Sequence, residues 1–181
     1  MDNKLKNYRK LSYILAFILL LIASCKTTRN IENELMNIKE NGNEIIAKSE
    51  GDLNLDGIND LVIVVENKKE NIRIVNVFIK DKNDGIIKKF SNQNIILSKE
   101  VSAYDFDSVT INNGKLFLNY YGGMCRRESQ TLIFEYQTKT KELSFYAFKV
   151  FTHNVCNETK DEQSEETELR GMKFAAYIKE Y

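Results

Sequence analysis

The chain has no proline, no tryptophan, a single histidine and no excess of charge of either sign over its 181 residues. The first 24 residues hold four of the 26 basic and one of the 26 acidic side chains, which leaves 22 basic and 25 acidic groups. Nucleic-acid binders show basic patches or stripes, and a balance this close to neutrality gives no electrostatic reason to expect such a partner. The sequence also lacks a Ser-His arrangement, a paired acid and base and a phosphate-binding glycine loop, which argues against catalysis.

A long apolar run is missing as well. The apolar stretch 11–23 is shorter than the roughly 20 residues that a helix needs to cross a bilayer. It follows a basic head that contains Lys4, Lys6, Arg9 and Lys10. A basic head before a short apolar core is typical of a secretory signal, whereas the alternative, a membrane anchor helix, requires a longer core.

The signal ends in a pattern for lipid attachment. Ile22-Ala23-Ser24-Cys25 fits a lipobox, in which small residues precede the cut and a thiol follows it. We therefore expect removal of residues 1–24, acyl chains on Cys25 and a short polar tether over 25–30. Two or more acyl chains anchor a protein stably. Lys26 in the next position resembles lipoproteins sent to the outer membrane of Gram-negative bacteria, on its periplasmic or its surface side.

Residues 31–181 predict one mainly β domain. Apolar residues at helical spacing before Asn41-Gly42 predict a short helix over 31–40. Beyond it, alternating runs separated by Asp-Gly or Asn-Gly turns predict antiparallel hairpins, in a meander or sandwich-like sheet. The expected strands are 44–49, 61–66, 72–80, 86–90, 94–97, 108–111, 115–121, 131–137 and 143–151. The acidic stretch 157–168 is expected to be a loop or arm, and 174–181 a last strand unless 171–181 forms a short helix.

The segment Gly51–Asp60 is the part of the sequence with metal-binding chemistry. Calcium requires six or more oxygens, and alternate residues of a tight loop direct their side chains to one centre. The side-chain oxygens belong to Asp52, Asn54, Asp56 and Asp60. Gly57 lies where the loop must turn, and Ile58 would add its main-chain carbonyl. An EF-hand would need Glu in the place of Ile63, so the alternative is an Asx-rich β-turn, which uses the same residue types.

At these residues the chain resembles known proteins. The stretch from Gly51 to Val65, D-x-N-x-D-G-x-x-D followed by L-V-I-V-V, resembles the calcium loops of FG-GAP and VCBS repeats. More narrowly, 34–66 and 115–136 resemble a group of small bacterial lipoproteins of unassigned activity. The resemblance implies a β scaffold outside the cytoplasm that is held by a structural Ca²⁺, and it implies no reaction. One loop of this kind cannot make a multi-bladed propeller.

Two cysteines remain besides Cys25, an even number that suits an oxidising compartment. Cys125 and Cys156 flank the expected hairpin 131–151, whose apolar pattern favours three cross-strand pairs. These pairs are Leu132 with Val150, Phe134 with Phe148 and Tyr136 with Tyr146. Extending that register brings the two cysteines within one residue of facing each other, which predicts a disulfide; the alternative is two buried thiols. His153 and Cys156 do not form a catalytic dyad on this interpretation, because an offset of three places them on opposite faces of a strand.

Recognition residues are expected near the Gly-Gly pair at 122–123. Arg126 and Arg127 would bind an anionic group of a partner, unless they simply begin a solvated strand. Tyr120 and Tyr121 belong to a set of aromatics in the last third of the chain. Alternation along strands sends every other one inward, and those facing outward would form a recognition patch.

These features lead to one functional hypothesis and two rivals. The leading hypothesis is a non-enzymatic, calcium-stabilised lipoprotein that binds a protein or a glycan at the outer membrane. The first rival is an immunity or inhibitor lipoprotein that blocks a secreted toxin or hydrolase. The second is a metal-dependent hydrolase, which would need an open coordination position on a cleft.

Overall fold

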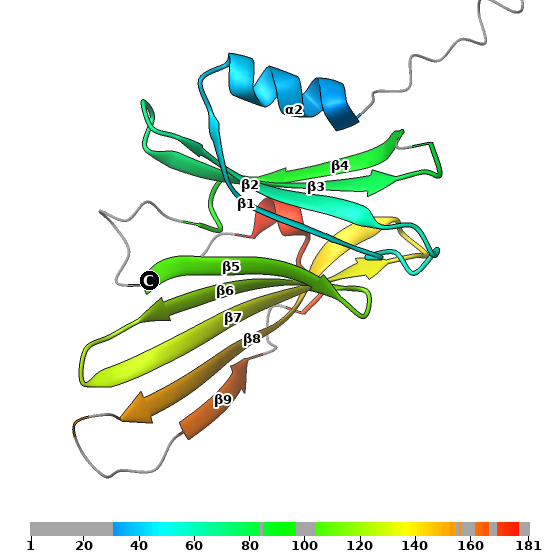
Figure 1. Cartoon of the computed structure of the whole chain (residues 1–181). Helices are drawn as coiled ribbons and strands as arrows, with labels where there is room; N and C mark the ends of the chain where they lie inside the picture. The colour runs from blue at the N-terminus through cyan, green and yellow to red at the C-terminus, as the bar shows by residue number, and fades with distance from the viewer. Residues whose placement is uncertain are drawn as a thin grey trace, which may run out of the picture.

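The computed structural model describes residues 31–83, 85–96, 104–154, 156, 162–166 and 170–177. They form a helix, two antiparallel sheets and a short 3-10 turn (Figure 1). The first sheet has the order β1-β2-β3-β4 and the second the order β5-β6-β7-β8-β9. The elements are α2 (Ile31–Glu40), β1 (Glu44–Gly51), β2 (Asp60–Asn67), β3 (Ile72–Lys80), β4 (Ile86–Asn92), β5 (Tyr104–Asn112), β6 (Lys115–Gly122), β7 (Arg126–Gln137), β8 (Glu142–Asn154), β9 (Glu162–Glu166) and η1 (Phe174–Ala176). The predicted fold class, antiparallel hairpins in a sandwich-like arrangement with one short helix, is confirmed.

The first sheet lies between the helix and the second sheet (Figure 1), and β2 is therefore covered on both faces. Val62 and Val64 pack into the main core between the sheets, whereas Leu61, Ile63 and Val65 face the other way, towards α2. This two-sided burial explains why β2 has a continuous apolar run instead of an alternating one.

Helix α2 has the bounds that its apolar spacing predicts. Ile31, Leu35 and Ile38 are half-buried and pack on the outward side chains of β2 and β3. The helix ends where Gly42 adopts a φ of +72°, a conformation that glycine takes without steric cost. The amide of Gly42 donates to the carbonyl of Lys39 at 3.0 Å, which satisfies one of the last carbonyls of the helix.

The main core joins the two sheets and is closed by the C-terminal turn. Phe134 on β7 lies in an edge-to-face arrangement with Phe174 and with Tyr177, at ring centroid distances of 5.0 and 5.4 Å. The Asn92 side-chain amide at the end of β4 donates to the carbonyl of Tyr177 at 2.8 Å. The expected last strand is therefore absent over 174–177. Of the expected short helix over 171–181, the described residues contain only the 3-10 turn 174–176, which closes the core, and 178–181 lie outside the described residues.

Two further segments differ from the prediction. The stretch 157–168, expected to be a loop, contains β9, whose main chain pairs with β8. Its glutamates disfavour a strand by composition, but an edge strand needs only main-chain partners and tolerates charge. The expected strand 94–97 is absent over 94–96, because Asn94 donates to the side chain of Asn92 and the carbonyl of Ile95 accepts from the Tyr120 hydroxyl. Ile95 and Ile96 are buried as core residues without strand pairing.

Candidate functional sites

The expected lipidation site cannot be placed on the fold. Cys25, the leader 1–24 and the tether up to residue 30 lie outside the described residues. Within the part of the chain that is described, no helix has the length and apolar character to span a membrane. The described domain begins at α2, whose first residue, Ile31, is six residues after Cys25 in the sequence.

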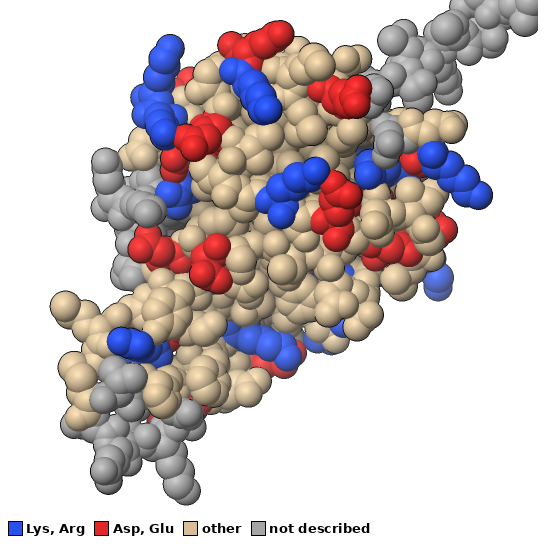
Figure 2. Space-filling model, in the orientation of Figure 1, with Lys and Arg blue, Asp and Glu red and all other residues tan. Residues whose placement is uncertain are grey.

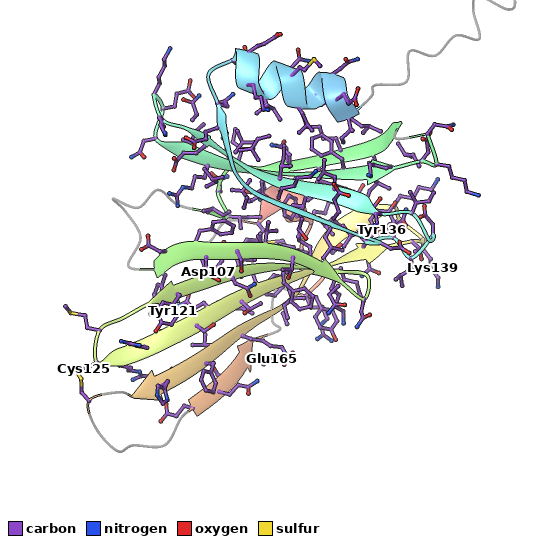
Figure 3. All side chains as sticks on the ribbon, viewed as in Figure 1. Asp107, Tyr121, Cys125, Tyr136, Lys139 and Glu165 are labelled. Atoms are coloured by element: carbon purple, nitrogen blue, oxygen red, sulfur yellow. A yellow bond between two sulfur atoms is a disulfide. The ribbon has the colours of Figure 1, made fainter. Side chains whose placement is uncertain are left out.

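Cys125 and Cys156 form the predicted disulfide, with their Cα atoms 5.0 Å apart. Arg126 pairs with Asn154 at the end of the β7–β8 ladder, and the cysteines follow just beyond this pair. The bond closes the ends of the longest hairpin and consumes both thiols, so Cys156 is not a nucleophile for His153. Figure 3 shows the bridge at the end of the second sheet opposite the β7–β8 turn.

The detailed register of that hairpin differs from the prediction. Leu132 pairs with Phe148, two residues away from its expected partner, and a bulge then places Phe134 opposite Phe145. Gln137 and Glu142 are the last pair of the β7–β8 ladder, so the turn that joins the two strands is short. The alternating apolar pattern of the hairpin gives no sign of this bulge between Ile133 and Phe134. On the cysteine side of the bulge the slip is two residues, and it still leaves Cys125 and Cys156 within one residue of facing each other, which explains why the predicted disulfide survives the error.

The acidic loop connects β1 to β2 and is closed by its own side chains. Asp52 accepts from the main-chain amides of Asp56 and Gly57, at 3.0 and 2.8 Å. Asn54 accepts from the Asp56 amide at 3.0 Å, and Asp56 accepts from the Ile58 amide at 2.9 Å. Gly57 has a φ of +83°, which is the sharp turn that its position predicts. These are the short-range hydrogen bonds of Asx turns.

Asp60 has a different role from the other acidic residues of the loop. Its side chain is 0% exposed, and it accepts from the amides of Leu53, Asn54 and Lys80 at 3.0, 3.3 and 3.0 Å. Burial raises the pKa of this carboxyl, and the negative charge of Asp56 raises it further, while the three amide donors oppose the shift. Asp60 therefore fastens the loop and the end of β3 to the start of β2.

We tested whether these residues fit a calcium ion. The donor set consists only of oxygens, which suits a hard cation. The inward hydrogen bonds already hold the loop in one conformation, and both oxygens of Asp60 face main-chain donors. Across the described ranges, no three His, Cys, Asp or Glu side chains gather as a group that would hold a metal ion. The chemistry of the donors fits calcium, whereas their arrangement is also sufficient for a turn without metal.

The predicted recognition residues divide between the two faces of the second sheet. Tyr120 is 1% exposed and donates from its hydroxyl to the Ile95 carbonyl, so it is a core residue and not part of a surface patch. Arg126 lies in ion pairs with Glu128 and Glu162. Tyr121 and Arg127 are exposed on the outer face, which points away from the first sheet.

Sequence reasoning missed a row of polar side chains on this outer face. Ser108, Asn119 and Thr131 lie on β5, β6 and β7, and they are linked by hydrogen bonds of 3.2 and 2.9 Å. A shallow groove of about 380 Å³ runs over them, with Phe117 and Ile133 at one side. In the sequence, short polar residues alternate with apolar ones in each of these strands, which indicates a polar face. Only the register of the strands places Ser108, Asn119 and Thr131 in one row.

Comparisons with protein families, with curated proteins and with solved structures found no match.

Proposed function

We propose that this chain is a lipoprotein held at the outer membrane through acyl chains on Cys25, and that its β domain is a non-catalytic binding module. The proposal rests on one combination. A basic and apolar leader ends in Ile22-Ala23-Ser24-Cys25, and the domain that follows contains the Cys125–Cys156 disulfide. Disulfides persist in the periplasm and on cell surfaces and are rare in the cytosol, so the bond supports the export that the leader predicts.

Calcium is the proposed stabilising ion of this module. It would be held by Asp52, Asn54, Asp56, the Ile58 carbonyl and Asp60, and when bound it would neutralise carboxylates that lie within nine residues of one another. The loop connects two neighbouring strands of the first sheet, and its tip lies against the β5–β6 turn, where a Cβ on Gly114 would be 3.1 Å from Leu55. A bound ion there would hold one sheet against a turn of the other.

Metabolic labelling tests the anchor directly. Bacteria that express the full chain are supplied with labelled palmitate, with and without an inhibitor of the lipoprotein signal peptidase. We expect label on the processed chain, loss of label in Cys25→Ala and accumulation of the unprocessed chain under the inhibitor. Mass spectrometry should show residues 1–24 removed and acyl mass on Cys25. Recovery of a chain that still begins at Met1 in untreated cells would contradict the proposal.

A further inference from the structure

The outer face of the second sheet presents two exposed aromatic side chains on one cross-strand row. The register aligns Tyr121 on β6, Ser129 on β7 and Phe151 on β8 in one cross-strand row. Tyr121 and Phe151 are 46% and 45% exposed. Their Cα atoms are separated by two strand spacings, about 10 Å, with only the small serine between them.

The next row along the same strands is polar and held in place. Thr131 donates from its hydroxyl to the Asn119 carbonyl oxygen at 2.9 Å, and Asn119 donates from its amide to the Ser108 hydroxyl at 3.2 Å. Hydroxyl and amide groups both donate and accept, and each keeps capacity for a further bond. Two residues along a strand correspond to about 6.8 Å, so this row lies next to the row of Tyr121, Ser129 and Phe151. The groove of about 380 Å³ lies over it, within the size range of small-molecule sites.

The charge on this face is balanced. Lys149, which lines the groove, is paired with Glu165 on β9 at 3.1 Å. In Figure 2 the lower part of the molecule is mostly tan, with scattered acidic and basic groups instead of a field of one sign. Figure 3 places Asp107, Tyr121 and Glu165 on β5, β6 and β9 of this sheet. The exposed Arg127 and Asp105 add one charge of each sign beside the row of Tyr121, so this face offers no field of one sign to a strongly charged ligand, and a neutral polar ligand suits it.

The two sheets also differ in what covers them. The outer face of the first sheet is packed under α2, with Leu61, Ile63 and Phe78 buried below the helix. In the second sheet, the described residues place no helix over the row of Tyr121, Ser129 and Phe151. Tyr121 and Phe151 are exposed on this face, whereas Tyr120 and Phe134, which belong to the same sheet, are buried.

We propose that this outer face binds a neutral carbohydrate chain, which lies along β7 from Ser129 to Ile133. One sugar ring stacks against the exposed Tyr121 and Phe151, where its C–H faces meet the electron-rich faces of the aromatic rings. The hydroxyls of the next sugar bond to Asn119 and Thr131, whose mixed donor and acceptor character matches a group that does both. The inference names the ligand class of the binding module proposed above and rests on that function.

Calorimetric titration of the full chain, purified in a detergent that contains no sugar, tests the inference. The probes are hexasaccharides of β-1,4-glucose, β-1,4-N-acetylglucosamine, α-1,4-glucose and β-1,3-glucose, titrated to several millimolar. We expect binding of at least one probe. Tyr121→Ala and Phe151→Ala should each weaken it about tenfold, the effect of losing one aromatic stacking contact. Tyr121→Phe keeps the ring and should retain binding, and Ile87→Ala, at an apolar residue 62% exposed on β4, should leave it unchanged.

The outcomes separate this inference from the proposed anchor. A chain that is processed and acylated but binds no probe overturns the carbohydrate inference and leaves the anchored module standing. Binding that is equal in Tyr121→Ala, Phe151→Ala and the unaltered chain also overturns it. The inference is also overturned if the chain binds a protein and none of the sugar probes, and if this binding is lost in the two alanine variants. That result would favour an inhibitor function. Circular dichroism and thermal melts confirm that the variants fold, as expected for exposed positions.

Discussion

The Asp60 carboxylate accepts a hydrogen bond from the main-chain amide of Lys80 at 3.0 Å, across 20 residues of sequence and between the neighbouring strands β2 and β3. The other carboxylate oxygen accepts from Leu53 and Asn54 at the opposite side of the loop. One buried side chain therefore joins the end of β1, the start of β2 and the end of β3. This is a structural task that does not depend on a bound ion.

Replacing Asp60 by alanine should destabilise the domain by about 2–4 kcal/mol, because it leaves buried main-chain donors without an acceptor. Urea unfolding followed by circular dichroism measures the loss. Asp56→Ala is the matched control, since its exposed side chain accepts only within the loop, and we expect a cost below about 1 kcal/mol. Equal losses in the two variants would show that Asp60 is not the residue that fastens the loop.

Removing the disulfide should cost about 3–4 kcal/mol in the chain-entropy model for a bridge between residues 31 apart. The double variant Cys125→Ser and Cys156→Ser should melt at a lower temperature than the oxidised chain. Adding a reducing agent should lower the melting temperature of the unaltered chain and leave the double variant unchanged. Peptide mapping without reduction should recover the linked pair, and two freely alkylated thiols in protein taken from the periplasm would contradict the bond.

The hydrogen bond from the Tyr104 hydroxyl to Glu128 predicts a pH-dependent contribution to stability. The bond, together with burial and the charge of Glu128, raises the pKa of Tyr104 above its usual value. A raised pKa in the folded state means that the folded chain holds the proton more tightly than the unfolded chain. The stabilisation is therefore complete below about pH 10, the usual pKa of tyrosine, and is lost as the pH rises through the higher folded value.

Tyr104→Phe tests this relationship. At neutral pH the variant should be about 1 kcal/mol less stable than the unaltered chain, the typical contribution of one hydrogen bond. The difference in unfolding free energy should stay constant up to about pH 10 and shrink above it. Denaturant titrations of both chains at matched pH values measure the difference, and lysines and other groups that titrate in both chains cancel in it. A difference that persists unchanged at high pH would contradict the assignment.

Calcium should stabilise the chain if the loop binds it. Binding to the native state alone adds about 1–3 kcal/mol when calcium exceeds its Kd by roughly ten- to a hundredfold. Chelator should then lower the melting temperature, and Asp56→Ala should abolish that sensitivity while Asp107→Ala, on the other sheet, should retain it. Mg²⁺ should substitute poorly because it requires a tighter octahedral site. No heat on titration with several millimolar calcium, and no shift in melting, would leave the loop as an Asx turn.

Local signals in the sequence determined much of this architecture. Helix α2 follows from apolar spacing before Gly42, and the hairpin at Asn112-Asn113-Gly114 follows from residues that tolerate a positive φ, as Asn113 and Gly114 do at +48° and +71°. The continuous apolar run of β2 indicated a strand by its β-branched residues. The flanking positions of the two cysteines about one hairpin were sufficient to predict their bond. Each of these depends on residues that are neighbours in the chain or on the two sides of one turn.

Only the tertiary structure decided which partner each strand meets. Alternation separates Tyr120 from Tyr121 onto opposite faces, but it does not say which face meets the first sheet, and so the sequence alone placed both in one patch. The strand β9 exists because β8 offers an unpaired edge, which the glutamate-rich sequence of β9 does not reveal. The row of Ser108, Asn119 and Thr131 depends on the register of three strands. Sequence periodicity records the direction of a side chain relative to its own strand, whereas burial and cross-strand neighbours depend on residues that are distant in the chain.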